Sequence, residues 1–187
     1  MRKFKMLTIA VLASASTVAM SSPADAQTQD SLSPVGYWVQ FDEDNDPGRG
    51  FVQGVVHSYF ATNDDFAKEG TLQMQIVVPI MNIKNNQITP AKINCDVCGT
   101  GHINGFRYNY KNKVALLDGL VFAGNMTPQP GTKKAGEGLE YDNGGVLNPN
   151  DGKTYNSKAQ VQDNGKTLFA RAYKGTGWYA IGKDAHW

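Results

Sequence analysis

Two turn signals near the C-terminal end constrain the fold of this chain most strongly. Asn150-Asp151-Gly152 and Asp163-Asn164-Gly165 contain Asp-Gly and Asn-Gly pairs, which favour the tight turns of β-hairpins. Between the two signals lies an extended segment with alternating side chains, one face of which carries Tyr155, Ser157, Ala159 and Val161. The sequence therefore predicts two successive antiparallel hairpins in this region.

The clearest strand pattern is Thr71 to Met81, TLQMQIVVPIM. Apolar side chains at every second position predict a half-buried strand whose inner face carries Leu72, Met74, Ile76, Val78 and Ile80. Pro79 limits the end of this strand to an edge or a bulge. Residues 37–41 and 51–60 are β-branched and aromatic, and they are also expected to be strands. A helical turn is expected only at Thr62 to Gly70.

Many short strands separated by turns predict an all-β fold with little helix. We expect an antiparallel β-barrel of about eight or more strands. The segment Gly124 to Gly138, GNMTPQPGTKKAGEG, has Pro, Gly and Lys without periodicity, and a flexible surface loop is predicted there.

The N-terminus has the pattern of a cleaved signal peptide. Arg2, Lys3 and Lys5 precede an apolar run, and Ala24-Asp25-Ala26 has the small residues of a cleavage site. The run is shorter than the roughly 20 residues needed to span a membrane, so no span is expected in the mature form. The predicted organisation is a signal peptide at 1–26, a short leader at 27–33 and a single barrel domain at 34–187, in a periplasmic or secreted protein.

The charge balance argues against nucleic-acid binding. The predicted signal peptide carries three of the 18 basic and one of the 17 acidic residues, which leaves 15 basic and 16 acidic residues in the mature chain. Nucleic-acid-binding domains carry a clear excess of positive charge. No nucleic-acid partner is therefore expected.

Several motifs occur in a characteristic order along the chain. Gly36-Tyr37-Trp38 looks like the first-strand G-x-W signature of lipocalins and related calycin barrels. It is followed by CDVCGTG, GGVLNPNDGKTY, LFARAY and IGKDAHW. Together these motifs resemble a bacterial exported family, that of domain of unknown function 2147. The chain departs from the family pattern where Tyr141 replaces a usual Trp, Asn148 a usual Asp, Ala172 a usual Gly and Lys183 a usual Arg.

This resemblance implies a lipocalin-like barrel without an established enzyme activity. In calycin barrels, the G-x-W tryptophan packs at the closed end beneath a basic side chain from a late strand. The resemblance therefore implies that Trp38 closes the barrel beneath Arg171 or Lys183, where a cation–π contact would contribute roughly 0.5–2 kcal/mol.

Cys95 and Cys98 are the two cysteines of the chain. A redox pair would require a low-pKa thiolate at a helix N-terminus, whereas turn-forming residues follow Cys98. A zinc site including His102 would supply three ligands where a structural site has four. Because export leads to an oxidising compartment, a loop disulfide without metal is predicted.

No catalytic motif or cofactor site is recognisable. Asp42, Asp44 and Asp46 resemble the start of a calcium loop, but Pro47 stands where an EF-hand needs glycine. The interpretation for these residues is an acidic turn. His57, His102 and His186 are scattered, and His57 is expected to be a core or edge histidine or to line a pocket.

The favoured hypothesis is a non-catalytic protein that binds a lipid or fatty-acid-like molecule inside the barrel. Met74, Ile76 and Val78 would form the apolar wall, and His57 or Tyr59 would supply a polar contact. Each of these residues could equally be ordinary core. The alternative is a cell-envelope or host-facing interaction protein with a filled barrel. A hydrolytic or redox enzyme is less favoured.

Cleavage after Ala26 can be tested on protein purified from its native host. Intact-mass and N-terminal peptide mass spectrometry should give a chain that begins at Gln27, because Ala24 and Ala26 supply the small side chains of the cleavage site. A chain that retains Met1 or Arg2 would contradict the predicted export signal.

Overall fold

The computed structural model of the chain describes residues 32–41, 52–62, 66–79, 81–84, 87–90, 92–110, 115–131, 134–175 and 181–187. The expected signal peptide at 1–26, the acidic stretch Asp42–Asp46 and Ile80 lie outside these residues. Within the described residues, no helix is long and apolar enough to cross a membrane.

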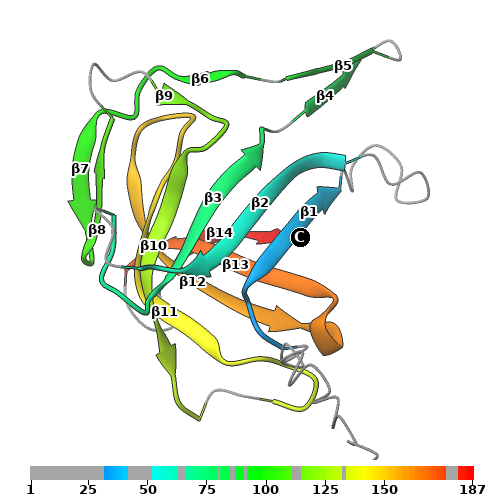
Figure 1. Ribbon diagram of the computed structural model, residues 1–187, viewed down its shortest axis with the longest axis vertical. Helices are drawn as coiled ribbons and strands as arrows, with labels where there is room; N and C mark the ends of the chain where they lie inside the picture. The colour runs from blue at the N-terminus through cyan, green and yellow to red at the C-terminus, as the bar shows by residue number, and fades with distance from the viewer. Residues whose placement is uncertain are drawn as a thin grey trace, which may run out of the picture.

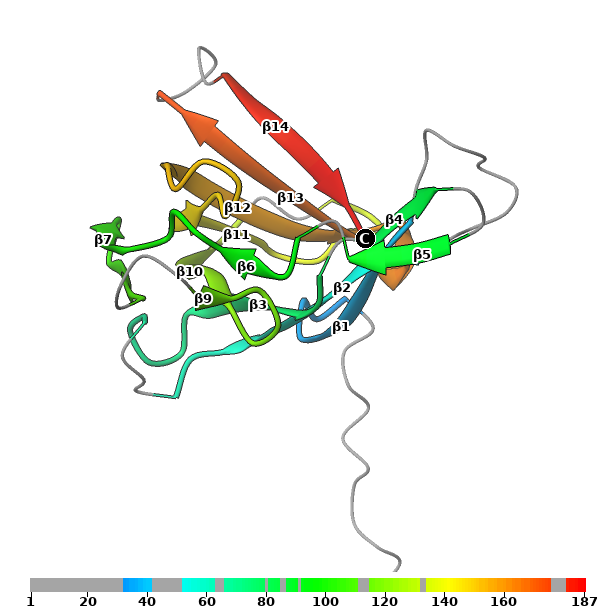
Figure 2. The ribbon, with the colours of Figure 1, turned by 90° about the horizontal axis from the view of Figure 1, so that it is seen from above.

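The main element in the described part of the chain is one eight-stranded antiparallel sheet, in the order β1-β2-β3-β10-β11-β12-β13-β14. Its strands are β1 (Gly36–Phe41), β2 (Val52–Phe60), β3 (Leu72–Val78), β10 (Val121–Gln129), β11 (Glu140–Leu147), β12 (Thr154–Gln162), β13 (Thr167–Lys174) and β14 (Ile181–His186). The sheet curls into a half-barrel (Figure 1), and the view from above places β13 and β14 opposite β1 and β2 (Figure 2). The predicted all-β, antiparallel fold is confirmed.

The segment between β3 and β10 forms three small two-stranded sheets: β4–β5, β6–β9 and β7–β8. Their strands are β4 (Met81–Lys84), β5 (Gln87–Pro90), β6 (Asn94–Cys95), β7 (Thr100–Ile103), β8 (Phe106–Asn109) and β9 (Ala115–Leu116). Along the chain, β7 and β8 lie between β6 and β9. A short 3-10 turn, η2 (Asp163–Gly165), joins β12 to β13.

The concave face of the curled sheet carries the main core. Its buried side chains come from both arms of the half-barrel and therefore meet inside it: Val56, Leu72, Met74, Ala123, Met126, Tyr141, Ala159, Val161 and Leu168. Leu32, Trp38 and Trp187 pack against this cluster. Each fully buried large aliphatic side chain contributes roughly 1.5–3 kcal/mol. Since Leu32 belongs to this packing, the predicted leader at 27–33 is not wholly separate from the domain.

A second core lies on the convex face, beneath the inserted small sheets. It combines sheet residues such as Val121 and Leu147 with residues of the insertion such as Phe106, Leu117 and Leu120. The approach is close at Gly145, where a Cβ would lie 2.3 Å from the Cγ2 of Ile103. A side chain at position 145 would therefore push the β7–β8 hairpin away from the sheet.

The two predicted hairpins are present. The first turn joins β11 to β12 with Leu147 opposite Thr154, and the second joins β12 to β13 with Gln162 opposite Thr167. In the second turn, both Asp163 and Asn164 have positive φ, at 52° and 57°. Asp and Asn tolerate this left-handed conformation better than most residues, so the signals Asn150–Gly152 and Asp163–Gly165 identified real turns.

Two local predictions were wrong. The expected half-buried strand at 71–81 ends at Val78, and its polar face is covered, because Gln73 is 0% exposed beneath the insertion. The expected loop at 124–138 begins too early, because β10 continues to Gln129 through pairing with β11. Of the expected helical turn at 62–70, residues 66–70 form bends and turns, and residues 63–65 lie outside the described part of the chain.

Trp38 is anchored by its indole N–H. The Nε1 atom donates hydrogen bonds to the carbonyl oxygen of Pro34 and to the Oγ of Ser58, each at 2.9 Å. The Ser58 hydroxyl in turn donates to Pro34. Trp38 therefore ties the segment before β1 to β2 at one end of the half-barrel, which we call the closed end.

Replacing Trp38 with Phe removes this donor but keeps an aromatic ring. We expect a loss of about 1–2 kcal/mol in the free energy of unfolding, because the indole N–H and its hydrogen bonds are lost at a half-buried site. Urea denaturation measures it. The adjacent Tyr37→Phe variant is the control, because Tyr37 is 67% exposed and its change should be within a few tenths of a kcal/mol. Equal stabilities of the two variants would contradict the anchoring role of the indole.

Candidate functional site

The concave face is filled unevenly from one end to the other. At the closed end, Leu72, Met126 and Leu168 are fully buried. Towards the opposite end, which we call the open end, the same face carries small or half-buried residues. Val146 and Tyr155 are half-buried there, and Lys174 is exposed. The side chains on this face are therefore packed less tightly at the open end than at the closed end.

Ser157 is the polar residue at the centre of this region. It lies on β12 on the face shared with Ala159 and Val161, both of which belong to the concave core. Ser157 is 5% exposed, and its Oγ has no hydrogen-bond partner among the described residues. Its cross-strand neighbours are Gly144 on β11 and Ala172 on β13. Both are small, and neither side chain can bond the hydroxyl.

Tyr155 and Lys174 lie beside Ser157 on the same face. Tyr155 precedes Ser157 by two residues on β12, and the Nζ of Lys174 is 4.9 Å from the centroid of the Tyr155 ring. The Tyr155 hydroxyl donates to Asp151 Oδ2 at 3.3 Å, and the same carboxylate oxygen is 3.8 Å from the Nζ of Lys153. The open end thus combines an apolar ring, a buried hydroxyl and an ammonium group. We call Tyr155, Ser157, Ala172 and Lys174 the concave site.

The three residues expected to form the apolar wall do not lie together. Met74 is 1% exposed and belongs to the concave core, whereas Ile76 packs against the second core on the convex face. Val78 is 37% exposed. The register of β10 against β3 shifts between Ala123, which pairs with Met74, and Val121, which pairs with Gln75. The register of β2 against β3 shifts between Ile76 and Val78. These irregularities give successive residues on this face of β3 different neighbours.

His57 and Tyr59 are on the convex face and do not point into the half-barrel. They alternate with Val56 and Ser58, which face the concave side. His57 stacks on Tyr37 with ring centroids 4.4 Å apart and on Tyr59 at 5.0 Å. We call Tyr37, His57 and Tyr59 the aromatic row. His57 and Tyr59 therefore lie on the face opposite to the one from which a contact inside the barrel was expected.

The expected basic neighbour of Trp38 also lies elsewhere. Ala170 packs against the concave core with Trp38, so the next residue, Arg171, is on the opposite face of β13. The prediction that Arg171 lies over Trp38 is corrected by this alternation. The backbone register places Lys183 opposite Ala172, and the side chain of Lys183 is outside the described residues.

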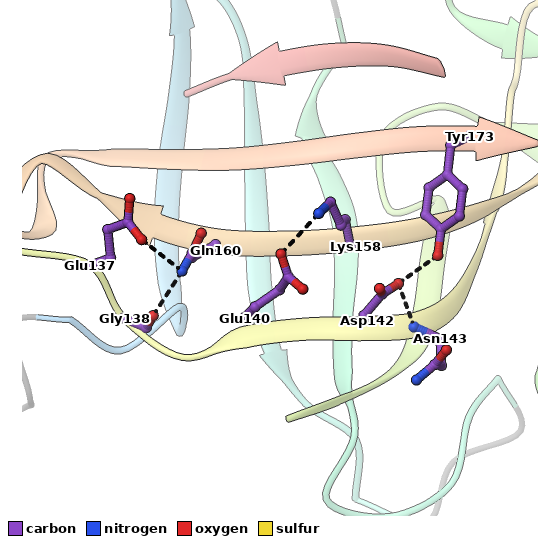
Figure 3. A network of polar contacts seen from close by, with 8 residues as sticks. All are labelled: Glu137, Gly138, Glu140, Asp142, Asn143, Lys158, Gln160 and Tyr173. Atoms are coloured by element: carbon purple, nitrogen blue, oxygen red, sulfur yellow. Dashed lines mark hydrogen bonds and ion pairs between the residues drawn. The ribbon is translucent and has the colours of Figure 1, made fainter. Parts of the chain in front are cut away.

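The convex face of β11, β12 and β13 carries a network of paired polar groups (Figure 3). Lys158 Nζ is 2.9 Å from Glu140 Oε2, and the Tyr173 hydroxyl donates to Asp142 Oδ1 at 2.6 Å. Burial, followed by the hydrogen bond to Asp142 and the nearby carboxylate charges, raises the pKa of Tyr173 well above its usual range. The network holds its charges in pairs, which is the arrangement of a structural surface.

The two cysteines form a disulfide that packs against the first hairpin turn. Their Sγ atoms are 1.94 Å apart, and Cys95 Sγ is 3.3 Å from the carbonyl oxygen of Pro149. Gly152 lies beneath the same loop, because a Cβ there would come within 2.4 Å of the carbonyl oxygen of Val97. The disulfide loop therefore supports the turn that leads into β12 and the concave site.

A surface pocket of about 800 Å³ lies outside the half-barrel, beside the β7–β8 hairpin. Its lining residues are Phe66, Thr100, Gly101, His102, Arg107, Tyr108 and Asn109. Desolvation raises the pKa of the Tyr108 hydroxyl. No group of three or more His, Cys, Asp or Glu side chains that could hold a metal ion occurs among the described residues.

Residues 36–187 match the family described as an uncharacterized protein conserved in bacteria (DUF2147). The chain belongs to this family. The matched region contains all strands from β1 to β14, the disulfide loop and the concave site. Searches of curated proteins and of solved structures each found no significant match.

The sequence pattern predicts which residues share a face with Ser157 but not the isolation of its hydroxyl. The alternation in β12 puts Ser157 with Tyr155, Ala159 and Val161, as predicted, but only packing shows that its hydroxyl is buried without a partner. Lys174 was missed, although a signal was present. The alternation in LFARAYK puts Lys174 on the face of Leu168 and Ala170, which would have directed it to the concave side.

Removing the disulfide tests its place in the fold. A Cys95→Ala, Cys98→Ala double variant should still unfold cooperatively in urea, with a loss within about 3 kcal/mol, because the closed loop is very short. The exposed Asp96→Ala change in the same loop is the control and should have a small effect. Loss of the cooperative transition would instead show that the bridge holds the whole domain together.

Proposed function

We propose that this chain is an exported, non-catalytic protein that binds a small amphipathic molecule at the open end of its concave face. The observation that carries the proposal is the uneven filling of that face. Fully buried aliphatic side chains occupy the closed end, whereas a half-buried ring, small side chains and an exposed lysine occupy the open end. Binding sites for small molecules are mostly apolar, with a few polar groups that fix orientation.

The proposed position differs from the one that the strand pattern suggested. Met74 is covered by its neighbours, so the apolar wall is supplied instead by Tyr155, Val146 and Ala172. Towards the closed end, this wall is continuous with the concave core. An apolar chain placed there would extend the contacts of Val146, which already packs against that core.

The test combines extraction with a blocking variant. The mature protein is purified from its native host without detergent, extracted with organic solvent and analysed by mass spectrometry. Binding of decanoate is then measured by isothermal titration calorimetry. Ala172→Phe should weaken binding by at least about tenfold, because the larger side chain fills the concave site.

The matched control is Ala135→Phe, the same change in an exposed turn. Its affinity for decanoate should equal that of the wild type. An empty extract together with no decanoate binding would overturn the proposed function, and equal weakening by both variants would place the ligand away from the concave site.

The aromatic row favours a second candidate, a protein-binding role. Tyr37 is 67% exposed and lies on β1, at one end of the strand order in the described sheet. Exposed aromatic residues are enriched at protein interfaces. If this candidate is correct, one defined partner should cross-link to a photoreactive residue at position 37 in the native host. Cross-linking from the exposed control position 166 should not capture it.

A further inference from the structure

The buried hydroxyl of Ser157 indicates what the concave site would recognise. Buried polar groups in folded proteins nearly always have a hydrogen-bond partner, and leaving one unpaired is costly. The Oγ of Ser157 has none among the described residues. Its flanking residues Gly144 and Ala172 have no polar side-chain atoms, so a partner would come from a bound molecule or a water.

Lys174 supplies a positive charge beside this hydroxyl. Three other lysines have carboxylate partners: Lys92 with Asp96, Lys153 with Asp151 and Lys158 with Glu140. Lys174 has no ion pair of this kind among the described residues, and its ammonium group lies 4.9 Å from the centroid of the Tyr155 ring. Asp151, which accepts a hydrogen bond from the Tyr155 hydroxyl, is engaged by Lys153. The ammonium group therefore remains available to an anion.

The strand register places the two donors on one face. Ser157 pairs with Ala172 on β13. Lys174 is two residues beyond Ala172 on the same strand and the same face. The small Ala172 thus lies beside both the hydroxyl and the ammonium group. A hydroxyl and an ammonium group together suit an oxyanion, because hydrogen bonds to charged groups are the stronger ones.

We infer that the concave site selects an oxyanion head group carried on an aliphatic chain, with Ser157 and Lys174 as its hydrogen-bond donors. This inference rests on the proposed function. Tyr155 would pack against the first carbons of the chain, and the rest of the chain would lie towards Val146. A carboxylate and a phosphate monoester share the chemistry that these two donors recognise.

Three probes with the same ten-carbon chain separate the head group from the chain: decanoate, decyl phosphate and decan-1-ol. Isothermal titration calorimetry on the mature protein should give tighter binding of at least one anion than of the alcohol, by about tenfold or more. The relative affinities of decanoate and decyl phosphate identify which oxyanion the site prefers.

Variants assign the preference to residues. Lys174→Gln should weaken binding of the preferred anion by about tenfold and leave decan-1-ol unchanged. Ser157→Ala should weaken binding of the preferred anion by a few-fold. The variant should fold normally, because no hydrogen bond within the protein is lost. The control is Lys166→Gln, an exposed lysine in the turn between β12 and β13, which should not change any affinity.

The outcomes are distinguishable. If the alcohol binds as tightly as both anions, or if Lys174→Gln behaves like Lys166→Gln, the inference fails while the proposed function stands. If no probe binds, both fail. If Ser157→Ala leaves all affinities unchanged while Lys174→Gln lowers the anion affinity, a water satisfies the hydroxyl, and its assignment as a donor is overturned.

Discussion

The fold depends on burial of apolar side chains between the two arms of one curled sheet. Leu72 and Val56 come from one arm and Val161 and Leu168 from the other, yet all four belong to one cluster. At roughly 25 cal/mol per Å² of apolar area, this burial provides the main free energy that keeps the sheet curled. The strand order β1 to β14 leaves two sheet edges, so side-chain packing rather than a hydrogen-bonded seam holds the arms together in the described structure.

The second core explains why the insertion between β3 and β10 is ordered around the sheet. Phe106 and Leu120 bury themselves against the convex face, and Gly145 allows the hairpin backbone to come close. The disulfide loop closes one end of this layer over the turn at 148–153. The insertion therefore acts on the concave site indirectly, because it supports the turn from which β12 and its residues Tyr155 and Ser157 begin.

The polar side chains on the two faces of β11–β13 differ in whether they have partners. On the convex face, Glu140 with Lys158 and Asp142 with Tyr173 satisfy one another (Figure 3). On the concave face, the Ser157 hydroxyl has no partner among the described residues, and the Lys174 ammonium group lies over the Tyr155 ring. Because natural proteins rarely leave buried polar groups unpaired, this contrast separates a structural surface from a candidate binding surface.

The sequence by itself determined the all-β class, the family, the hairpin turns and which residues of β12 share a face. These properties are local: Asp and Asn tolerate positive φ in tight turns, and side chains alternate along a strand. Only the tertiary structure decided which side chains share a site. Register shifts along β3, against β10 beside Met74 and against β2 between Ile76 and Val78, gave these three residues different neighbours. Alternation in β13 turned Arg171 away from Trp38. Covering of Gln73 and isolation of the Ser157 hydroxyl depend on contacts between segments far apart in the chain, which no local pattern encodes.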